Sequence, residues 1–296
     1  MKLSVNPDIA DSRFFFYVFT GEQQQEFIRI GTIQTGVPHI NLGILRDIPV
    51  QLPPLGEQRA IAAALSDVDA LIQGLDQLIA KKRDIKQAAM QQLLTGQTRL
   101  PGFSEAWQMK TLGDIFSISA GKSKSSYIVD SGKNWIVDMG SVSIDGKLTV
   151  SKSTNYSGDF LNVGDLIMPK DDIGGGGIIG KVGYIDINKT YVLGDHVYRL
   201  VVNYGNSLFL SYVINGHRTN SELRKKVIGS AQLGLGRKSV SEQNVPFPSY
   251  QEQTAIAAVL SDMDADIDTL VQRRDKTREL KQGMMQELLT GRIRLI

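Results

Sequence analysis

A glycine-rich stretch, GGGGIIGKV at residues 174–182, has the composition of a phosphate-binding loop. Gly175, Gly180 and Lys181 have the spacing of a P-loop, whose backbone N–H groups and lysine hold nucleotide phosphates. However, Val182 stands where that motif requires Ser or Thr, and the VGYIDI pattern after it indicates a strand where a P-loop opens a helix. AGKS at 120–123 lacks the upstream glycine. We therefore interpret the glycine run as a hairpin turn.

Two other patterns could support chemistry on nucleic acid. Asp171, Asp172 and Asp195 could bind a metal ion for cleavage, but the sequence offers no convincing set of further ligands and a lysine around them. NVPF at 244–247 is similar to the N-P-P-F motif of adenine methyltransferases, but its second residue differs and no glycine-rich cofactor motif accompanies it. We expect no catalytic, cofactor or metal site, and we interpret the aspartates as turn residues.

Basic and polar residues in the loops of residues 101–250 indicate a different role. Lysine, arginine, serine and glutamine in glycine-rich loops suit contacts to the phosphates and base edges of DNA. Over this segment 16 basic residues face 13 acidic ones, so the interpretation depends on their placement rather than on net charge. The candidate DNA-binding residues are Lys122, Lys124, Ser125, Tyr127, Lys170, Lys181, His196, Gln232, Arg237, Lys238 and Ser239.

The composition of the chain excludes several classes of protein. The 296 residues are 42% hydrophobic and 22% charged, which is typical of a soluble protein with room for two domains. Cysteine is absent, which excludes disulfides and thiolate metal sites, and no two of the three histidines are spaced as a metal-binding pair. No apolar run of about 18 residues predicts a membrane span, and the N-terminus has no signal-peptide pattern. We expect a cytoplasmic protein.

The candidate loops lie between two copies of one long segment. Residues 57–100 and 252–295 align without a gap at a constant offset, 252 − 57 = 195, with 26 identities in 44 positions. In the first copy apolar residues recur in steps of four and three from Ile61 to Ile79, which is the spacing of a coiled coil. The pattern predicts two long helices that pack on each other. Ser249 and Glu252 suggest a capping box, and Gly96 and Gly291 suit the helix ends.

The similarity between the two halves extends upstream of the helices. SRFFFYVFTGEQQQEFIRI from residue 12 parallels SLFLSYVINGHRTNSELRKKV from residue 207, and both segments predict short helices. Between the copies, NWIVDMGSVSI, DLIMPK, GKVGYIDI and HVYRLVV predict strands separated by turns. We predict an α+β fold with a mixed, largely antiparallel domain and two long helices forming an antiparallel coiled coil. The predicted parts are a domain remnant at 1–55, a helix at 56–100, a complete domain at 101–250 and a second helix at 251–296.

This order of elements resembles the specificity subunit of type I restriction-modification enzymes. The similar segments are PPLGEQRAIAAALSDVD, YQEQTAIAAVLSDMD, the repeated LLTG, the domain opening from Trp107 to Ile115, and the stretch from Gly164 to Val182. The resemblance covers nearly everything from residue 12 onward. It departs from the family in one respect, because members usually carry two complete target recognition domains and most of the first is missing here.

The resemblance implies a non-catalytic subunit that reads one half of a bipartite site in double-stranded DNA. It implies long helices that set the spacing of recognition domains and dock methyltransferase (M) subunits, which bring S-adenosylmethionine, and a restriction/motor (R) subunit. A self-contained methyltransferase or nuclease is the alternative, and a coiled-coil structural protein is a third. Because one complete domain cannot read both halves of a split site, we also expect a homodimer. The aromatic group Phe14 to Phe19, which needs a partner surface, favours the same expectation.

Overall fold

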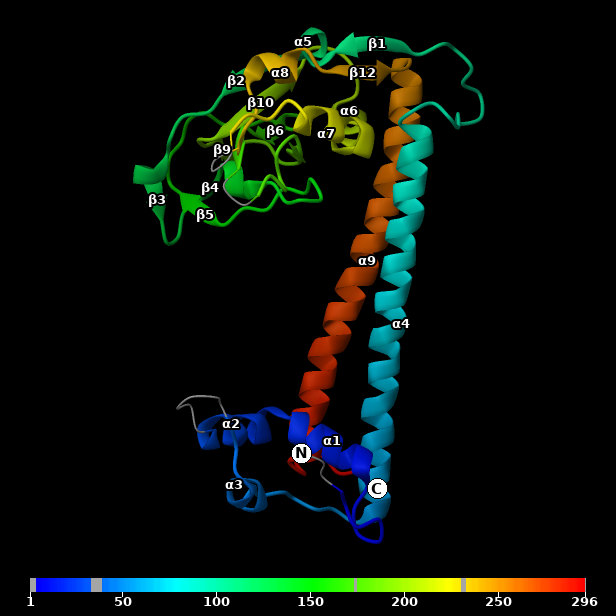
Figure 1. The fold of residues 1–296 in the computed structure, drawn as a ribbon, viewed down its shortest axis with the longest axis vertical. Helices are drawn as coiled ribbons and strands as arrows, with labels where there is room; N and C mark the ends of the chain where they lie inside the picture. The colour runs from blue at the N-terminus through cyan, green and yellow to red at the C-terminus, as the bar shows by residue number, and fades with distance from the viewer. Residues whose placement is uncertain (1–3, 33–38, 173–174, 230–232, 296) are drawn as a thin grey trace. The chain divides into compact units, whose positions relative to one another are not determined.

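The computed structural model describes residues 4–32, 39–172, 175–229 and 233–295. These residues form two compact units (Figure 1). We call residues 4–83 with 265–295 the terminal unit, and residues 84–264 the central unit. The division of the chain into four parts from its sequence remains a prediction.

The helices follow the predicted repeat. They are α1 (Ser12–Thr20), α2 (Glu22–Gly31), α3 (Leu42–Arg46), α4 (Leu55–Leu93), α5 (Leu112–Ile115), α6 (Ser207–Asn215), α7 (His217–Arg224), α8 (Arg237–Ser241) and α9 (Tyr250–Leu289), with 3-10 turns η1 (Ser125–Tyr127) and η2 (Met139–Ser141). α1, α2 and α3 occupy the positions of α6, α7 and α8 shifted by 195 residues. Asp11 and Asn206, which are equivalent in the repeat, both cap the following helix with a side-chain oxygen.

The ends of the long helices are set by local chemistry. Gly96 and Gly291, just beyond α4 and α9, have φ of 72° and 69°, a left-handed conformation in which glycine carries no Cβ penalty. Of the two hydrogen bonds of the predicted capping box of α9, the structure shows the one to the Ser249 side chain, and the prediction for the Glu252 side chain is wrong. The backbone N–H of Glu252 does donate to Ser249 Oγ at 3.4 Å. The Glu252 carboxylate, however, accepts from the side chains of Arg99 and Trp107. A buried carboxylate gains more from a guanidinium than from one backbone amide.

The strands belong to the central unit. They are β1 (Gln108–Thr111), β2 (Phe116–Ala120), β3 (Ile128–Val129), β4 (Asn134–Val137), β5 (Lys152–Thr154), β6 (Leu166–Pro169), β7 (Asp171–Asp172), β8 (Gly183–Tyr184), β9 (Tyr191–Leu193), β10 (Val197–Val202), β11 (Leu233–Gly234) and β12 (Asn244–Phe247). One four-stranded sheet has the order β2-β10-β6-β8 and another β3-β5-β4-β9, while β1 pairs with β12 and β7 with β11. Only the β4–β9 pair is parallel among these strands, which confirms the largely antiparallel prediction.

One detail of the strand prediction differs from the structure, and another agrees with it. Residues 141–144 do not continue β4, because η2 turns the chain and Val142 makes only an isolated bridge to Leu148. The glycine run leads into β8, which pairs antiparallel with β6, so a strand rather than a helix follows it. That outcome confirms the choice of a turn over a P-loop.

The central unit contains two apolar cores. The larger lies where the sheet β2-β10-β6-β8 meets α6 and the adjoining parts of α4 and α9; its fully buried members include Leu112, Ile115, Leu166, Phe209 and Leu260. The smaller joins the two four-stranded sheets through residues such as Val137, Leu161, Ile167 and Val197. These cores fix the sheet from which the candidate loops emerge.

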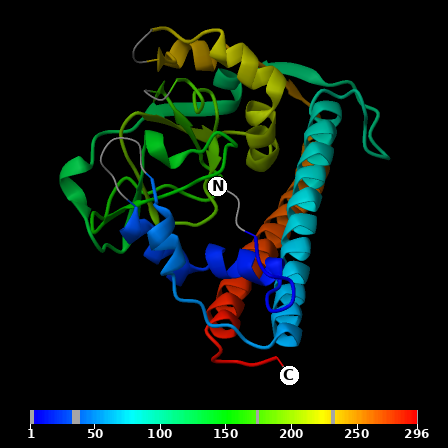
Figure 2. The ribbon, with the colours of Figure 1, turned by 60° about the horizontal axis from the view of Figure 1, so that its bottom comes forward.

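Within each unit the long helices run antiparallel, and they lie side by side in two views (Figures 1 and 2). In the terminal unit Asp69 binds Lys281 at 2.7 Å and Asp76 binds Arg278 at 3.0 Å. In the central unit Lys86 binds Asp264 at 2.5 Å. The apolar seam faces inward, with Ile61, Leu65, Leu75, Ile79, Ile256, Leu260 and Ile267 buried. The predicted pairing of helix one with helix two is confirmed within each unit.

Candidate functional site

The candidate loops emerge from one end of the sheet β2-β10-β6. Ala120 at the end of β2 lies opposite Tyr198, and Pro169 at the end of β6 lies opposite Val197. Antiparallel strands place the end of two neighbours beside the start of the strand between them. The loops that carry Lys122, Lys170 and His196 therefore begin at the same sheet end. The site is the product of strand register, which brings together residues up to 74 positions apart (196 − 122).

The segment before α8 joins the same end. β7 pairs with β11, and the Leu235 N–H donates to the Lys170 carbonyl at 2.8 Å. The buried Tyr198 hydroxyl donates to the Leu235 carbonyl at 3.1 Å. Arg237, Lys238 and Ser239 follow directly on α8. The two basic side chains are exposed, and Lys238 makes only a loose ion pair with Glu242 at 3.7 Å.

His196 occupies a strained backbone position in this cluster of loops. Its φ is 60°, a left-handed conformation that is uncommon for a residue other than glycine. Two carboxylates hold it there: Asp195 Oδ1 accepts its backbone N–H at 2.7 Å, and Asp171 Oδ2 lies 2.7 Å from its Nδ1. Its ring is about half exposed, which leaves the imidazole edge accessible from solvent. Asp171, considered above as a metal ligand, therefore orients a loop histidine.

A pocket of about 330 Å³ collects three of the candidates, Lys124, Ser125 and His196. Lys152 and Asp138, which the sequence interpretation missed, also line it and form an ion pair with each other. No sequence motif around Lys152 or Asp138 indicates that either residue lines a pocket. They reach the pocket because β5 pairs with β4, so only strand register could have identified them.

Two of the candidate lysines use their ammonium groups inside the protein. Lys124 is buried, binds Asp159 at 2.8 Å and lies over the Tyr156 ring, 5.2 Å from its centroid. Its hydrogen bond holds the pKa of the Asp159 carboxyl below the ordinary value. Lys181 is partly buried, and its Nζ donates to the Asn215 carbonyl at 3.1 Å. Burial lowers the pKa of the Lys181 ammonium. Both lysines stabilise the loops around them.

The other candidates differ in exposure. Lys122 and Ser125 are exposed, and Tyr127 is about half exposed with its ring 4.8 Å from that of Tyr156. Lys170 is half-buried beside Asp171. Gln232 lies outside the described residues. Among the predicted candidates, the accessible positive charges are therefore Lys122, Arg237 and Lys238, with Lys170 partly accessible.

The residues considered above for metal binding or methyl transfer have other structural positions in the described part of the chain. No group of three or more His, Asp or Glu side chains there is arranged to hold a metal ion. The Asp172 carboxylate accepts the Ile178 N–H at 3.2 Å, and NVPF forms β12 paired with β1. None of the helices in these same ranges is both long and apolar enough to span a membrane.

One interaction set occurs in both units and was not predicted. Tyr17 donates to Asp69 at 2.8 Å, and Lys281 binds the same aspartate and lies 5.4 Å from the centre of the tyrosine ring. In the central unit Tyr212, Asp264 and Lys86 repeat these contacts, with the tyrosine donating at 2.7 Å and the lysine 5.2 Å from the ring. Each tyrosine and aspartate comes from one copy of the repeat, and each lysine comes from the other. The repeat thus extends to side-chain contacts.

Comparison with known proteins identifies the class to which this fold belongs. The family model for the type I restriction modification DNA specificity domain matches residues 1–81 and 104–279. The chain belongs to this family. It is therefore a DNA specificity subunit, as its sequence predicted, and such subunits recognise DNA without performing catalysis.

Relatives and solved structures agree with this assignment. The specificity subunit of the type I restriction enzyme MjaVIII from Methanocaldococcus jannaschii is 27% identical over 316 residues, covering 100% of this chain and 73% of that protein. The putative MjaX specificity subunit of the same organism is 25% identical, and the match covers 100% of this chain and 71% of that protein. A type I restriction-modification S subunit from M. genitalium has the same fold, with a TM-score of 0.68 at 18% identity over 96% of this chain and 74% of that one.

Proposed function

We propose that residues 101–250 read one half of a bipartite site in double-stranded DNA through the loops at the β2-β10-β6 sheet end. The observation that carries this proposal is the convergence of Lys122, Lys170, His196 and the start of α8 at that end. Separate segments of the chain supply polar and basic groups to one surface. Variation in such loops can change specificity while the sheet stays the same.

The exposed cations and the remaining polar groups have different parts in this recognition. Lys122, Arg237 and Lys238 contact phosphates, which fixes the register on the duplex without reading sequence. Ser125, Tyr127 and His196 supply hydroxyl groups and an imidazole edge that can contact bases in the major groove. Lys124 and Lys181 hold the loops in shape through Asp159 and Asn215.

In the assembled enzyme this chain supplies specificity and its partners supply the reaction. The long helices dock methyltransferase subunits, which bind S-adenosylmethionine and methylate adenine, and a restriction/motor subunit joins through the complex. A solved structure of the same fold, with a TM-score of 0.59, comes from work on complex assembly and conformational transition of a type I restriction-modification system. The setting is the cytoplasm, where such subunits meet DNA.

A homodimer would supply the second half of the recognition surface. Residues 101–250 supply one recognition domain in this proposal, and a bipartite site needs two. Two copies related by a two-fold axis would read a palindromic split target. Light scattering at micromolar concentrations should give twice the chain mass, and a strict monomer would exclude this arrangement.

The DNA contacts are tested by the salt dependence of binding. Joint replacement of Lys122, Arg237 and Lys238 by Ala should weaken DNA binding by the assembled complex. It should also reduce the slope of log K against log salt concentration by about 2.7, at about 0.9 for each phosphate contact. The matched control removes three exposed cations of the long helices, Lys81, Arg83 and Arg273, and should leave the slope unchanged.

Replacing Lys124 and Lys181 by Ala separates their internal role from direct contact with DNA. These variants should lower the stability of the central unit, whereas the three exposed positions should not. If the triple variant binds with the same affinity and salt slope as the unmodified chain, the assignment of these loops is wrong.

A further inference from the structure

Three residues from separate parts of the chain form one row across the small sheet of β7 and β11. Gly234 on β11 pairs with Asp171 on β7, and on its other side it exchanges two backbone hydrogen bonds with Ile228, at 2.8 and 2.9 Å. Directly opposed residues of antiparallel strands carry their side chains on the same face. The next pair, Leu233 with Asp172, faces the other way, where Asp172 is buried and Leu233 packs against the larger core. Ile228 and Asp171 therefore share the outward face.

The glycine in the middle of the row leaves a gap between the two side chains. The Cα atoms of Ile228 and Asp171 lie about 10 Å apart, since one hydrogen-bonded and one non-hydrogen-bonded pair separate them. A Cβ built on Gly234 would lie 3.5 Å from Asp171 Oδ1, so this oxygen extends toward the gap. The other oxygen, Oδ2, lies 2.7 Å from His196 Nδ1. The row thus presents an apolar group, a gap and a carboxylate oxygen, in that order.

Ile228 is exposed in a basic setting. Its side chain is 76% exposed, more than any other large apolar side chain of the described residues. Gly234 has no side chain with which to cover it. Lys225, three residues before Ile228, and Arg237, three residues after Gly234, are exposed as well. An apolar group beside accessible cations, next to the loops proposed for DNA, suits contact with nucleic acid.

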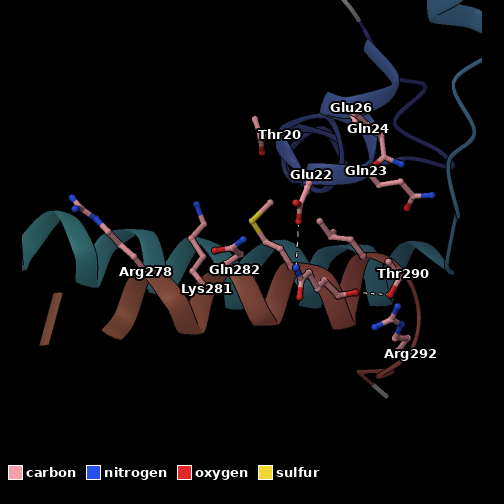
Figure 3. A pocket seen from close by; sticks show the side chains of 14 residues that line it. Thr20, Glu22, Gln23, Gln24, Glu26, Arg278, Lys281, Gln282, Thr290 and Arg292 are labelled. Carbon is pink, nitrogen blue, oxygen red and sulfur yellow. Dashed lines mark hydrogen bonds between the residues drawn. The ribbon is translucent and has the colours of Figure 1, made fainter. Parts of the chain in front are cut away.

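The cations of the terminal unit are arranged differently (Figure 3). Beside a groove of about 890 Å³ between α9 and the turn from α1 to α2, Arg278 binds Asp76 and Lys281 binds Asp69. A cation that already donates to a carboxylate has fewer donors left for a phosphate. The row in the central unit is therefore the better candidate for a contact with DNA.

The major-groove edge of a T·A base pair matches the row. That edge presents the thymine methyl group, the thymine O4 acceptor, the adenine N6 amino donor and the adenine N7 acceptor. Ile228 suits the methyl group, and Asp171 Oδ1, across the gap, can accept a hydrogen bond from the amino group. A C·G pair also offers an amino group, but cytosine has no methyl group for Ile228.

We propose that Ile228 and Asp171 read one T·A base pair of the half-site, with Ile228 on the thymine methyl group and Asp171 on the adenine amino group. His196 acts as a positioning residue, because it holds Asp171 through Oδ2. This inference rests on the DNA recognition proposed above and adds to it a base pair and the two side chains that select it.

The test uses duplexes that carry the recognition sequence, which is obtained by mapping the positions that the assembled complex methylates. Each thymine of that sequence is replaced in turn by uracil, which removes only the methyl group. Binding is compared for complexes with the unmodified chain, Ile228→Ala and Ile187→Ala, and circular dichroism checks folding. Ile187 is the matched control, because it is 49% exposed and follows β8 at the sheet end where β6 begins.

At one position uracil should weaken binding by the unmodified complex about fourfold, the effect expected for one buried methyl group. Ile228→Ala should weaken binding to the thymine duplex and abolish the difference between thymine and uracil at that position, whereas Ile187→Ala should keep it. Purine in place of the adenine of the same pair lacks the N6 amino group. It should weaken binding by the unmodified complex and cause no further loss in Asp171→Ala.

A recognition sequence without a T·A pair overturns the assignment, and so does an Ile228→Ala variant that still distinguishes thymine from uracil. An equal loss in Ile228→Ala on every duplex would indicate insertion between bases or a backbone contact, and would also overturn it. In these cases DNA recognition by the loops stands. If the assembled complex binds the mapped duplex no better than unrelated DNA, the proposed function fails and this inference with it.

Discussion

Replacing Glu252 by Ala should destabilise the central unit far more than the equivalent change in the terminal unit. The Glu252 side chain is 1% exposed and accepts two hydrogen bonds from Arg99, at 2.5 and 2.7 Å, and one from Trp107 at 2.9 Å. The variant leaves the Trp107 N–H without this acceptor, which costs about 1–3 kcal/mol. It also removes charge-assisted bonds of roughly 1.5–3 kcal/mol, part of which water restores at the partly exposed Arg99. We expect a net loss of about 3 kcal/mol.

Tryptophan fluorescence is a selective assay for this loss. Both tryptophans of the chain, Trp107 and Trp135, lie in the central unit. For a unit of this size, a loss of about 3 kcal/mol should lower the melting temperature followed by fluorescence by about 6–12 °C. Glu252→Gln keeps an acceptor for Trp107 and should show a smaller shift.

The matched control is Glu57→Ala, at the same place in the other copy. Glu57 makes the equivalent two bonds with Arg294, both at 2.6 Å, but that arginine is 57% exposed and water can replace them. This variant should leave the fluorescence transition in place and change only the circular dichroism of the terminal unit. If the Glu252 variant shifts the fluorescence midpoint no more than the Glu57 variant, the argument from burial is refuted.

Three further outcomes are expected. Burial raises the pKa of the Tyr198 hydroxyl above its ordinary value of 10.0. The unfolded state therefore loses this proton at a lower pH than the folded state, and the free energy of unfolding should fall as pH rises past about 10. In Tyr198→Phe this fall, measured by alkaline denaturation, should be shallower. Gly74 lies inside α4, where a methyl group on its Cα would meet open space, so Gly74→Ala should stabilise that helix by about 1 kcal/mol, seen by circular dichroism in denaturant. The purified chain should neither cleave DNA nor transfer methyl groups from S-adenosylmethionine, and labelled DNA in that assay would contradict the assignment.

The elements with local signals were predictable from the sequence. The recurrence of apolar residues in steps of four and three from Ile61 to Ile79 predicted α4. The gapless repeat extended that prediction to α9. The left-handed glycines at the helix ends followed from LLTG. The short helices before each long helix were predicted from the parallel between SRFFFYVF and SLFLSYVI, and Asp11 and Asn206 at the same position cap both of them.

The partners of charged side chains could not be predicted in the same way, because they depend on tertiary contacts. Lys124 was assigned to DNA from its loop, and nothing near it in sequence indicates Asp159 as its partner. Glu252 has the spacing of a capping residue, yet it binds Arg99, which lies 153 residues earlier. Lys152 reaches the pocket beside His196 only through the pairing of β5 with β4. Loop charge therefore selected residues that the fold gathers at one sheet end, and exposure in the fold separates the accessible cations among them from the internal ones; their contact with DNA remains a prediction.

The composition of the terminal unit has a consequence for synthesis of the chain on the ribosome. Residues 84–264 form the central unit without interruption, so it can fold once its own segment has emerged. The terminal unit cannot, because residues 4–83 pack with residues 265–295, which are synthesised last. The hydrogen bond between Glu57 and Arg294 joins residues 237 positions apart, and Leu288 belongs to the apolar cluster that buries Phe14. Neither contact can form until the C-terminal residues have been synthesised. During that interval the N-terminal aromatic residues lack their final cover, and a chaperone that binds exposed apolar segments would have its longest opportunity there.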